Sequence, residues 1–174
     1  GTHMDAPYHF EASEETIDQI ALDRCHGRAR VLRLADVAPK ALIGVDELGA
    51  LSESFPPGDS LLIQTNWSRY FGRPEFRDEM PRISAELARW CVEKKVRMLG
   101  VEPPSVADVH NLAEVTEVHQ ILLGGNVIIV EGLAYLDRVP VDRVHFWAIP
   151  LKIDRGDGSP CRAFCSPVDE DEPG

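Results

Sequence analysis

Two histidines and an aspartate lie close together in the first ten residues, GTHMDAPYHF. His3 and Asp5 are two residues apart, which places both side chains on one face of an extended chain. Pro7 fixes its own φ and favours extended geometry at the preceding residue, so the segment does not form a helix, and His9 continues the same two-residue period. Imidazole nitrogens and carboxylates suit Zn²⁺ or Mn²⁺. The segment therefore predicts part of a metal site.

The first four residues have a second interpretation. Gly-Thr-His-Met also matches the remnant of a cleaved expression tag, and such remnants are excluded from fold reasoning. A tag does not explain residues 5–10, which continue the motif. The origin of residues 1–4 stays open at this point.

A second pair of residues with suitable chemistry lies far along the chain. His119 falls on or beside the apolar face of a helix expected over residues 108–123. Glu131 follows the apolar strand pattern of residues 127–130. A carboxylate at such a strand end is costly to bury unless it pairs with a cation. Taken alone, His119 more often fits a hydrogen-bonded core histidine than a metal ligand.

The elements that position these residues alternate between strand and helix. Aliphatic runs predict strands, and capped, periodic segments predict helices. The expected strands are 29–34, 60–64, 96–101, 127–130 and 144–149, and the expected helices are 45–52, 84–95 and 108–123. Strands and helices in this order indicate an α/β domain.

Three segments resemble signatures of the metal-dependent cyclase family, which includes bacterial kynurenine formamidases and isatin hydrolases. GTHMDAPYH resembles the signature H-x-G-T-H-x-D-x-P-x-H. HQILLGGNVIIVEGL resembles the second signature, in which a helix histidine and a strand-terminal glutamate complete the metal site. PLKIDRGDGSPCRAF resembles the closing segment, which we interpret as a loop that edges the site or contacts another subunit.

The first signature is incomplete in this sequence. The leading histidine of the family pattern would fall two residues before Gly1. Either the sequence is a piece of a longer protein or one metal ligand is absent, and we expect the former.

The resemblance implies a fold and a site. The expected fold is a mixed α/β domain, residues 1–168, with a partly barrel-like sheet and flanking helices, followed by an acidic tail at residues 169–174. The implied metal ligands of one or two Zn²⁺ or Mn²⁺ ions are His3, Asp5, His119 and Glu131. His9 is then free to act as a general base or proton shuttle.

The implied reaction is hydrolysis of a C–N amide bond in an arylformamide or a cyclic amide by water that the metal activates. Trp67, Tyr70 and Phe71 follow a predicted strand and could stack on a flat aromatic substrate or pack beneath their loop. Two alternatives remain: a catalytically silent homologue that acts as a binding module, and a metal-assisted lactonase or dehydratase.

Composition narrows the class of partner. The chain has 29 acidic and 18 basic residues, a net charge of −11, which disfavours nucleic acid and anionic membranes. No apolar run approaches the roughly 20 residues that cross a bilayer, so we expect a cytoplasmic protein. A small-molecule substrate is what the family resemblance implies. The four cysteines form no paired metal-binding knuckles and are expected to be reduced thiols. The family resemblance implies a homodimer or homotetramer.

Overall fold

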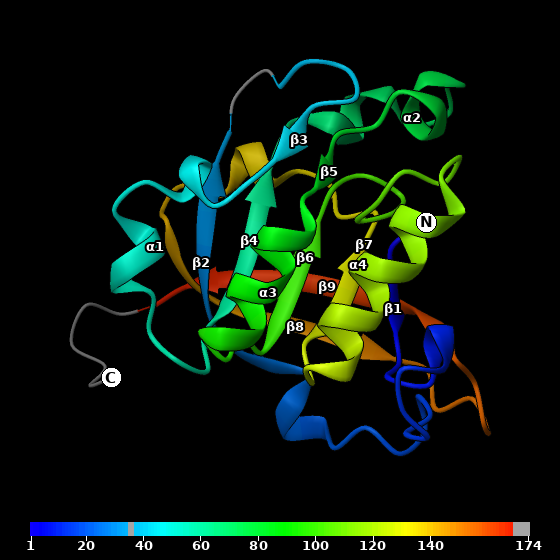
Figure 1. Cartoon of the computed structure of the whole chain (residues 1–174). Coiled ribbons are helices and arrows are strands. Elements are labelled where there is room, and N and C mark those ends of the chain that lie inside the picture. Colours follow the sequence, from blue (N-terminus) through cyan, green and yellow to red (C-terminus); the bar gives the residue numbers. More distant parts are fainter. Residues whose placement is uncertain (35–36, 169–174) are drawn as a thin grey trace.

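The structure is a computed structural model that describes residues 1–34 and 37–168. The predicted acidic tail, residues 169–174, lies outside the described residues. The expectation of a mixed α/β fold with a barrel-like sheet and flanking helices is confirmed (Figure 1).

Seven strands form a closed barrel in the order β1-β7-β6-β4-β2-β8-β9. Four neighbouring strands are parallel: β2, β4, β6 and β7. Strand β1 closes the barrel by pairing antiparallel with both β7 and β9, and β8 pairs antiparallel with β2 and β9. The strand bounds are β1 His3–Asp5, β2 His26–Arg33, β4 Ser60–Gln64, β6 Met98–Val101, β7 Ile128–Glu131, β8 Arg143–Pro150 and β9 Gly158–Pro167.

Two helices lie against the parallel strands, as Figure 1 shows for α3 (Ala85–Glu93) and α4 (Leu112–Gly124). The Ser84 hydroxyl caps α3 by accepting a hydrogen bond from the Leu87 N–H at 3.0 Å. Asn111 caps α4 in the same way. One apolar core packs these helices against the sheet, and a second core fills the barrel.

The remaining elements are short. They are the helices α1 (Leu51–Ser54) and α2 (Glu75–Asp78), the 3₁₀ turns η1 (His9–Glu11), η2 (Leu22–Arg24), η3 (Asp46–Leu48), η4 (Trp67–Tyr70) and η5 (Leu136–Arg138), and a two-stranded sheet of β3 (Leu42–Ile43) and β5 (Arg82–Ile83). The predicted helix over residues 45–52 is wrong as one element. Gly49, with φ of 53°, separates η3 from α1.

The closing segment differs from the prediction of a loop. Its residues 151–157 do form a loop, but β9 starts at Gly158 and is a ten-residue strand. The alternation along β9 explains this, because Cys161 and Cys165 pack against the barrel core while Phe164 is exposed on the opposite face. Sequence analysis missed a strand in which the inward positions are small or weakly apolar.

Residues 1–4 are integrated into the barrel. The Met4 side chain is fully buried, and the Thr2 hydroxyl donates to the Gly132 carbonyl at 2.7 Å. Strand β1 is therefore part of the folded barrel, where it pairs with β7 and β9.

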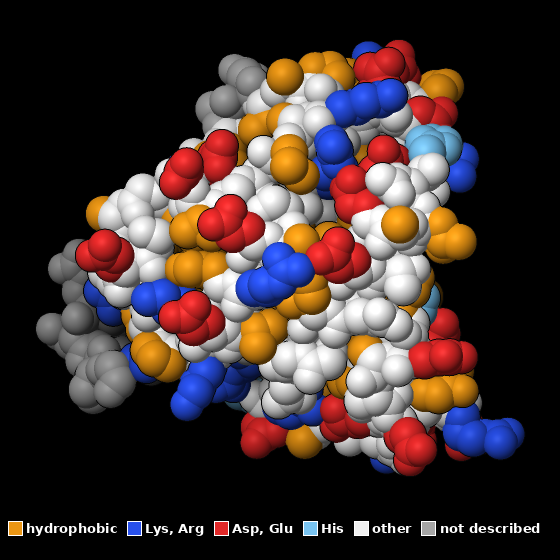
Figure 2. All heavy atoms as spheres, viewed as in Figure 1, with side chains coloured by type: hydrophobic (Ala, Val, Ile, Leu, Met, Phe, Trp, Pro, Cys, Tyr) orange, Lys and Arg blue, Asp and Glu red, His pale blue; other side chains and the backbone are white. Residues whose placement is uncertain are grey.

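Charges of both signs are mixed on one face of the molecule. On the face in Figure 2, which is viewed as Figure 1, acidic and basic side chains are interspersed among the described residues. No described helix is long and apolar enough to span a membrane.

Candidate metal centre

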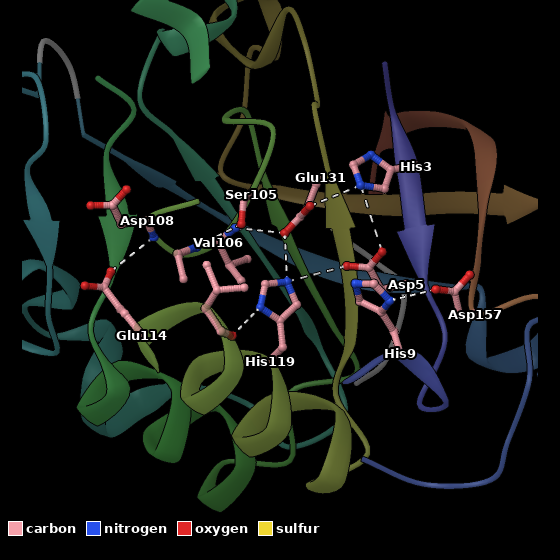
Figure 3. Close-up of polar contacts among 12 residues, drawn as sticks. His3, Asp5, His9, Ser105, Val106, Asp108, Glu114, His119, Glu131 and Asp157 are labelled. Atoms are coloured by element: carbon pink, nitrogen blue, oxygen red, sulfur yellow. Dashed lines mark hydrogen bonds and ion pairs between the residues drawn. The ribbon is translucent and has the colours of Figure 1, made fainter. Parts of the chain in front are cut away.

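Four side chains that are distant in sequence converge at one end of the barrel (Figure 3). His3 and Asp5 come from β1, Glu131 ends β7, and His119 comes from α4. The antiparallel register sets His3 directly beside Glu131. The period of β1 directs His3 and Asp5 to the same side, as the sequence predicted. The fold thus brings together the four residues singled out as candidate ligands.

The donor atoms lie at separations that fit a shared ion. His3 Nε2 is 3.1 Å from Glu131 Oε2 and 3.9 Å from Asp5 Oδ1. His119 Nε2 is 3.5 Å from Glu131 Oε1 and 3.9 Å from Asp5 Oδ2. Two ligands at about 2.0–2.1 Å from one tetrahedral ion are roughly 3.3 Å apart. The cluster therefore has approximately the dimensions of a metal site.

The histidine rings are held with Nε2 available. The Nδ1–H of His119 donates to the Val115 carbonyl at 2.7 Å, and the Nδ1–H of His3 donates to the Gly1 carbonyl at 2.9 Å. Because a carbonyl oxygen only accepts, these contacts assign the proton to Nδ1 in the neutral ring. In the neutral ring, the Nε2 lone pair is therefore the one that can bind a cation.

Asp5 shows most directly that the residues fit a cation. Its carboxylate is buried, and Oδ2 has no hydrogen-bond partner among the described residues. Burial, together with the nearby negative charge of Glu131, raises the pKa of Asp5 to about 7, against the effect of the two histidines. A buried carboxylate oxygen without a donor is costly unless a cation compensates it.

Glu131 is better satisfied than Asp5. Its Oε1 accepts a hydrogen bond from the Val106 N–H at 2.8 Å. Burial alone would raise the pKa of Glu131, but the contacts from His119 and His3 outweigh it and lower the pKa. The same contact with Glu131 raises the pKa of His3 to about 9. In the metal-free site, His3 and His119 therefore supply the positive charge that stabilises the ionised Glu131 carboxylate.

His9 belongs to the same cluster. The donor atoms of Asp5, His9 and His119 lie within 4.8 Å of one another, and so do those of His3, Asp5 and Glu131. Asp5 belongs to both groups, so it would be able to contribute to one ion or to two. His9 is thus close enough either to bind an ion or to exchange a proton beside one.

A cavity of about 440 Å³ opens onto the cluster. Its polar floor includes the side chains of the candidate ligands and of His9. Apolar side chains line another part of the cavity, from Phe10, Pro104, Val109, Val115 and Pro160, and Ser105, Asp157 and Ser159 add polar groups. A small ligand with a flat apolar part and one polar group would match these walls.

The three aromatic residues proposed from the sequence lie outside this cavity. Trp67 is buried, and its indole N–H donates to the Phe76 carbonyl at 3.0 Å. Tyr70 packs against Trp67, with ring centroids 4.5 Å apart, and the exposed Phe71 lines a separate cavity. The structure therefore favours the packing interpretation for Trp67.

Sequence reasoning missed two residues of the site. Asp157 accepts a hydrogen bond from His9 Nδ1 at 3.0 Å, and Phe10 places its ring 4.6 Å from that of His119. Asp157 stands in the closing motif and Phe10 directly follows His9, so both positions lay in segments that the sequence had already marked. Neither contact follows from local spacing, because the barrel brings both into place.

Comparisons with known proteins identify the family. The cyclase family model matches residues 1–108, more than half of the chain. The kynurenine formamidase of Bacillus cytotoxicus is 33% identical over 168 residues, which cover 97% of this chain and 76% of that protein. The kynurenine formamidase of Bacillus cereus is 33% identical over 170 residues, with the same coverage.

Solved structures give the same picture. Isatin hydrolase A from Ralstonia solanacearum is 28% identical, with a TM-score of 0.82 over 95% of this chain and 70% of that chain. A predicted metal-dependent hydrolase from Bacillus stearothermophilus is 30% identical, with a TM-score of 0.71 over 94% and 74%. Isatin hydrolase A from Labrenzia aggregata, at 24% identity, shares the fold with a TM-score of 0.87 over 97% and 73%.

Proposed function

Because this chain belongs to the cyclase family, we propose that it is a metal-dependent amidohydrolase that cleaves the C–N bond of an arylformamide or a cyclic amide. Its relatives named kynurenine formamidase and isatin hydrolase support this reaction class. The observation that carries the proposal is the buried Asp5 carboxylate beside His3, His119 and Glu131, whose Oδ2 has no hydrogen-bond donor within the described part of the chain.

In this proposal His3, Asp5, His119 and Glu131 hold one or two Zn²⁺ or Mn²⁺ ions. When bound, such an ion polarises a carbonyl oxygen and makes water more acidic, which are the two needs of amide hydrolysis. Both imidazoles would bind through Nε2, since their Nδ1–H groups are engaged by backbone carbonyls. Asp5 would contribute to both ions if two are present, because its oxygens face both donor groups.

His9 would transfer the proton in this reaction. Hydrolysis adds water across the C–N bond, so one water proton must reach the departing nitrogen while the carbonyl carbon gains oxygen. His9 lines the cavity beside Asp5 and His119, and its ring centroid is 5.7 Å from that of His119. An imidazole at this position can accept the proton from water and return it to nitrogen.

The cavity supports a flat substrate. Phe10 and Val115 provide apolar surface directly beside the polar cluster. An aromatic ring could pack there while its amide group reaches the cluster. Trp67, Tyr70 and Phe71 do not line the cavity, so the proposal gives them no contact with the substrate.

A substrate panel tests the reaction class. The protein is stripped with a chelator, reloaded separately with Zn²⁺ or Mn²⁺, and assayed on an N-formyl arylamine, a cyclic arylamide and a lactone. We expect metal-dependent hydrolysis of at least one of the two amides, and His9→Ala should lower kcat by about 10²–10⁴-fold. Turnover of the lactone alone would contradict the proposal and favour a lactonase. Stoichiometric metal binding without turnover of any compound would favour the binding module.

Two further parts of the proposal come from the sequence and the family resemblance. We expect a cytoplasmic location and a homodimer or homotetramer. Sedimentation analysis of the purified protein measures the second directly, and a monomer at micromolar concentration would contradict it.

A further inference from the structure

Asp157 is the acidic residue at the cavity that the proposed ligand set does not use. It lies at the end of the 151–157 loop, and its Oδ2 is 3.0 Å from Nδ1 of His9. Figure 3 shows the His9 ring between Asp157 on one side and Asp5 on the other. Asp157 is absent from both groups of candidate metal ligands among the described residues.

The chemistry of this contact determines the tautomer of His9. An ionised carboxylate has no proton to donate, so the hydrogen in the contact belongs to His9 Nδ1. In the neutral ring Nε2 is then unprotonated, and it is the nitrogen left to face the cavity. The reverse tautomer would lose the hydrogen bond to Asp157.

The backbone on both sides of this contact is fixed. The Ala6 N–H donates to the Asp157 carbonyl at 2.8 Å, which ties the loop to the chain just after β1. Gly158 pairs with Asp5 in the sheet, and a Cβ at Gly158 would lie 2.9 Å from the Met4 carbonyl oxygen. The loop and the histidine segment are therefore held together without help from the Asp157 side chain.

The His9 ring is held on its other sides by aromatic contacts. Phe10 meets it edge to face at 4.6 Å, and His119 does so at 5.7 Å. Phe10 itself has φ of 56°, a left-handed conformation uncommon for a non-glycine residue, and its carbonyl accepts from the Gln120 side chain at 3.2 Å. These contacts restrain the ring plane, but none of them selects which nitrogen carries the proton.

We propose that Asp157 is a positioning residue that holds His9 in the Nδ1-protonated tautomer, with Nε2 ready to accept a proton from water. The catalytic part of this inference rests on the proposed amide hydrolysis. The geometric part, the tautomer, stands on the contact between the two side chains. Because Asp157 is 62% exposed, its hydrogen bond contributes little to folding. Its role should therefore appear in the reaction and in the His9 ring rather than in stability.

The tautomer is measured without any substrate. Long-range ¹H–¹⁵N NMR of the metal-free protein, with ring signals assigned by comparison with His9→Ala, should show His9 protonated at Nδ1. In Asp157→Ala we expect a shift towards the Nε2-protonated form. Asp154→Ala is the matched control, since Asp154 lies in the same loop, is 85% exposed and forms an ion pair with its neighbour Arg155. An unchanged His9 tautomer in Asp157→Ala would overturn the inference.

Kinetics on the metal-loaded protein give the second test. Asp157→Ala should lower kcat about 10–100-fold with KM, metal content and Tm close to wild type. Asp157→Asn should retain part of the activity, because its amide oxygen can still accept from Nδ1. In a double-mutant cycle, Asp157→Ala should have no further effect on a His9→Ala background.

The outcomes separate the two proposals. Equal losses from Asp157→Ala in the wild-type and His9→Ala backgrounds would show that Asp157 does not act through His9. If the wild-type protein hydrolyses neither amide, the proposed function fails, and the NMR comparison alone decides whether Asp157 sets the tautomer.

Discussion

Burial of the Asp5 carboxylate is electrostatically costly in the metal-free site. Burial raises its pKa from 3.8 to about 7. Between these values the unfolded chain has released the proton that the folded protein still holds, so the stability of the metal-free protein falls as pH rises through this window. Asp5→Asn removes this titration. The difference in Tm between Asp5→Asn and wild type should be more favourable to the variant by a few degrees at pH 8 than at pH 4. The variant should also bind metal at least about tenfold more weakly.

Thermal melts in chelator at the two pH values, together with metal titrations, measure both effects. Asp154→Asn is the control, because that carboxylate is 85% exposed. A difference in Tm between Asp5→Asn and wild type that is the same at pH 4 and pH 8 would contradict the assignment of the burial cost to Asp5.

The individual site residues differ in how far sequence could predict them. His3 and Asp5 follow from the two-residue period of a strand, and the strand-terminal position of Glu131 already indicated a buried carboxylate in need of a cation. Their convergence with His119 needed the family resemblance, since spacing alone cannot bring a helix and two strands together. Their role as ligands remains a prediction. Asp157 could not be predicted from local pattern, because its partner His9 is 148 residues away.

At the scale of elements, the contact between β1 and β9 controls the geometry of the site. A Cβ added at Gly158 would lie 2.9 Å from the Met4 carbonyl oxygen, closer than real Cβ contacts. Gly158→Ala should therefore push β9 away from β1, shift both Asp5 and Asp157, and destabilise the protein by about 1–3 kcal/mol. Denaturant unfolding and kcat should both register the change.

Gly124→Ala is the matched control for this substitution. Gly124 ends α4, and the nearest atom to an added Cβ is the Ala12 carbonyl oxygen at 3.9 Å, an ordinary contact. It should leave kcat unchanged and raise stability slightly, by about 0.5–1 kcal/mol, because alanine favours helix. Wild-type stability and activity in Gly158→Ala would show that the two strands can separate at no cost.

Element prediction succeeded where the pattern was strong. The helix expected over 84–95 was found at Ala85–Glu93 with the expected Ser84 cap, and the strand expected over 60–64 matches β4. The strand β9 was missed because proline, cysteine and serine residues weaken its apolar alternation. Pairing with β1 on one side and β8 on the other stabilises β9 instead. The local sequence does not predict such long-range pairing.

For the whole molecule, the buried carboxylates connect folding to metal binding. Asp5 and Glu131 come from different parts of the chain and meet only when the barrel has closed. An ion that binds the folded state alone stabilises it by about 2.7 kcal/mol at a free concentration of 100 Kd. Tm should therefore rise with Zn²⁺ or Mn²⁺ concentration and fall on chelation. A Tm that is independent of both ions would count against a site formed by folding.

The mixed barrel with outer helices was expected from the resemblance, and the observed strand order confirms it. Composition limited only the class of partner that the molecule could bind. The net charge of −11 disfavours anionic partners but does not specify the fold.

Metal stoichiometry of wild type and Glu131→Gln is the most direct test of the central claim. Each protein is stripped, dialysed against a small excess of Zn²⁺ or Mn²⁺, and analysed by inductively coupled plasma mass spectrometry. We predict one or two ions per wild-type chain and a clear loss in Glu131→Gln, which keeps the shape of the side chain but removes its charge. Wild-type protein without bound metal, or equal metal in both proteins, would contradict the claim that these four side chains bind a catalytic ion.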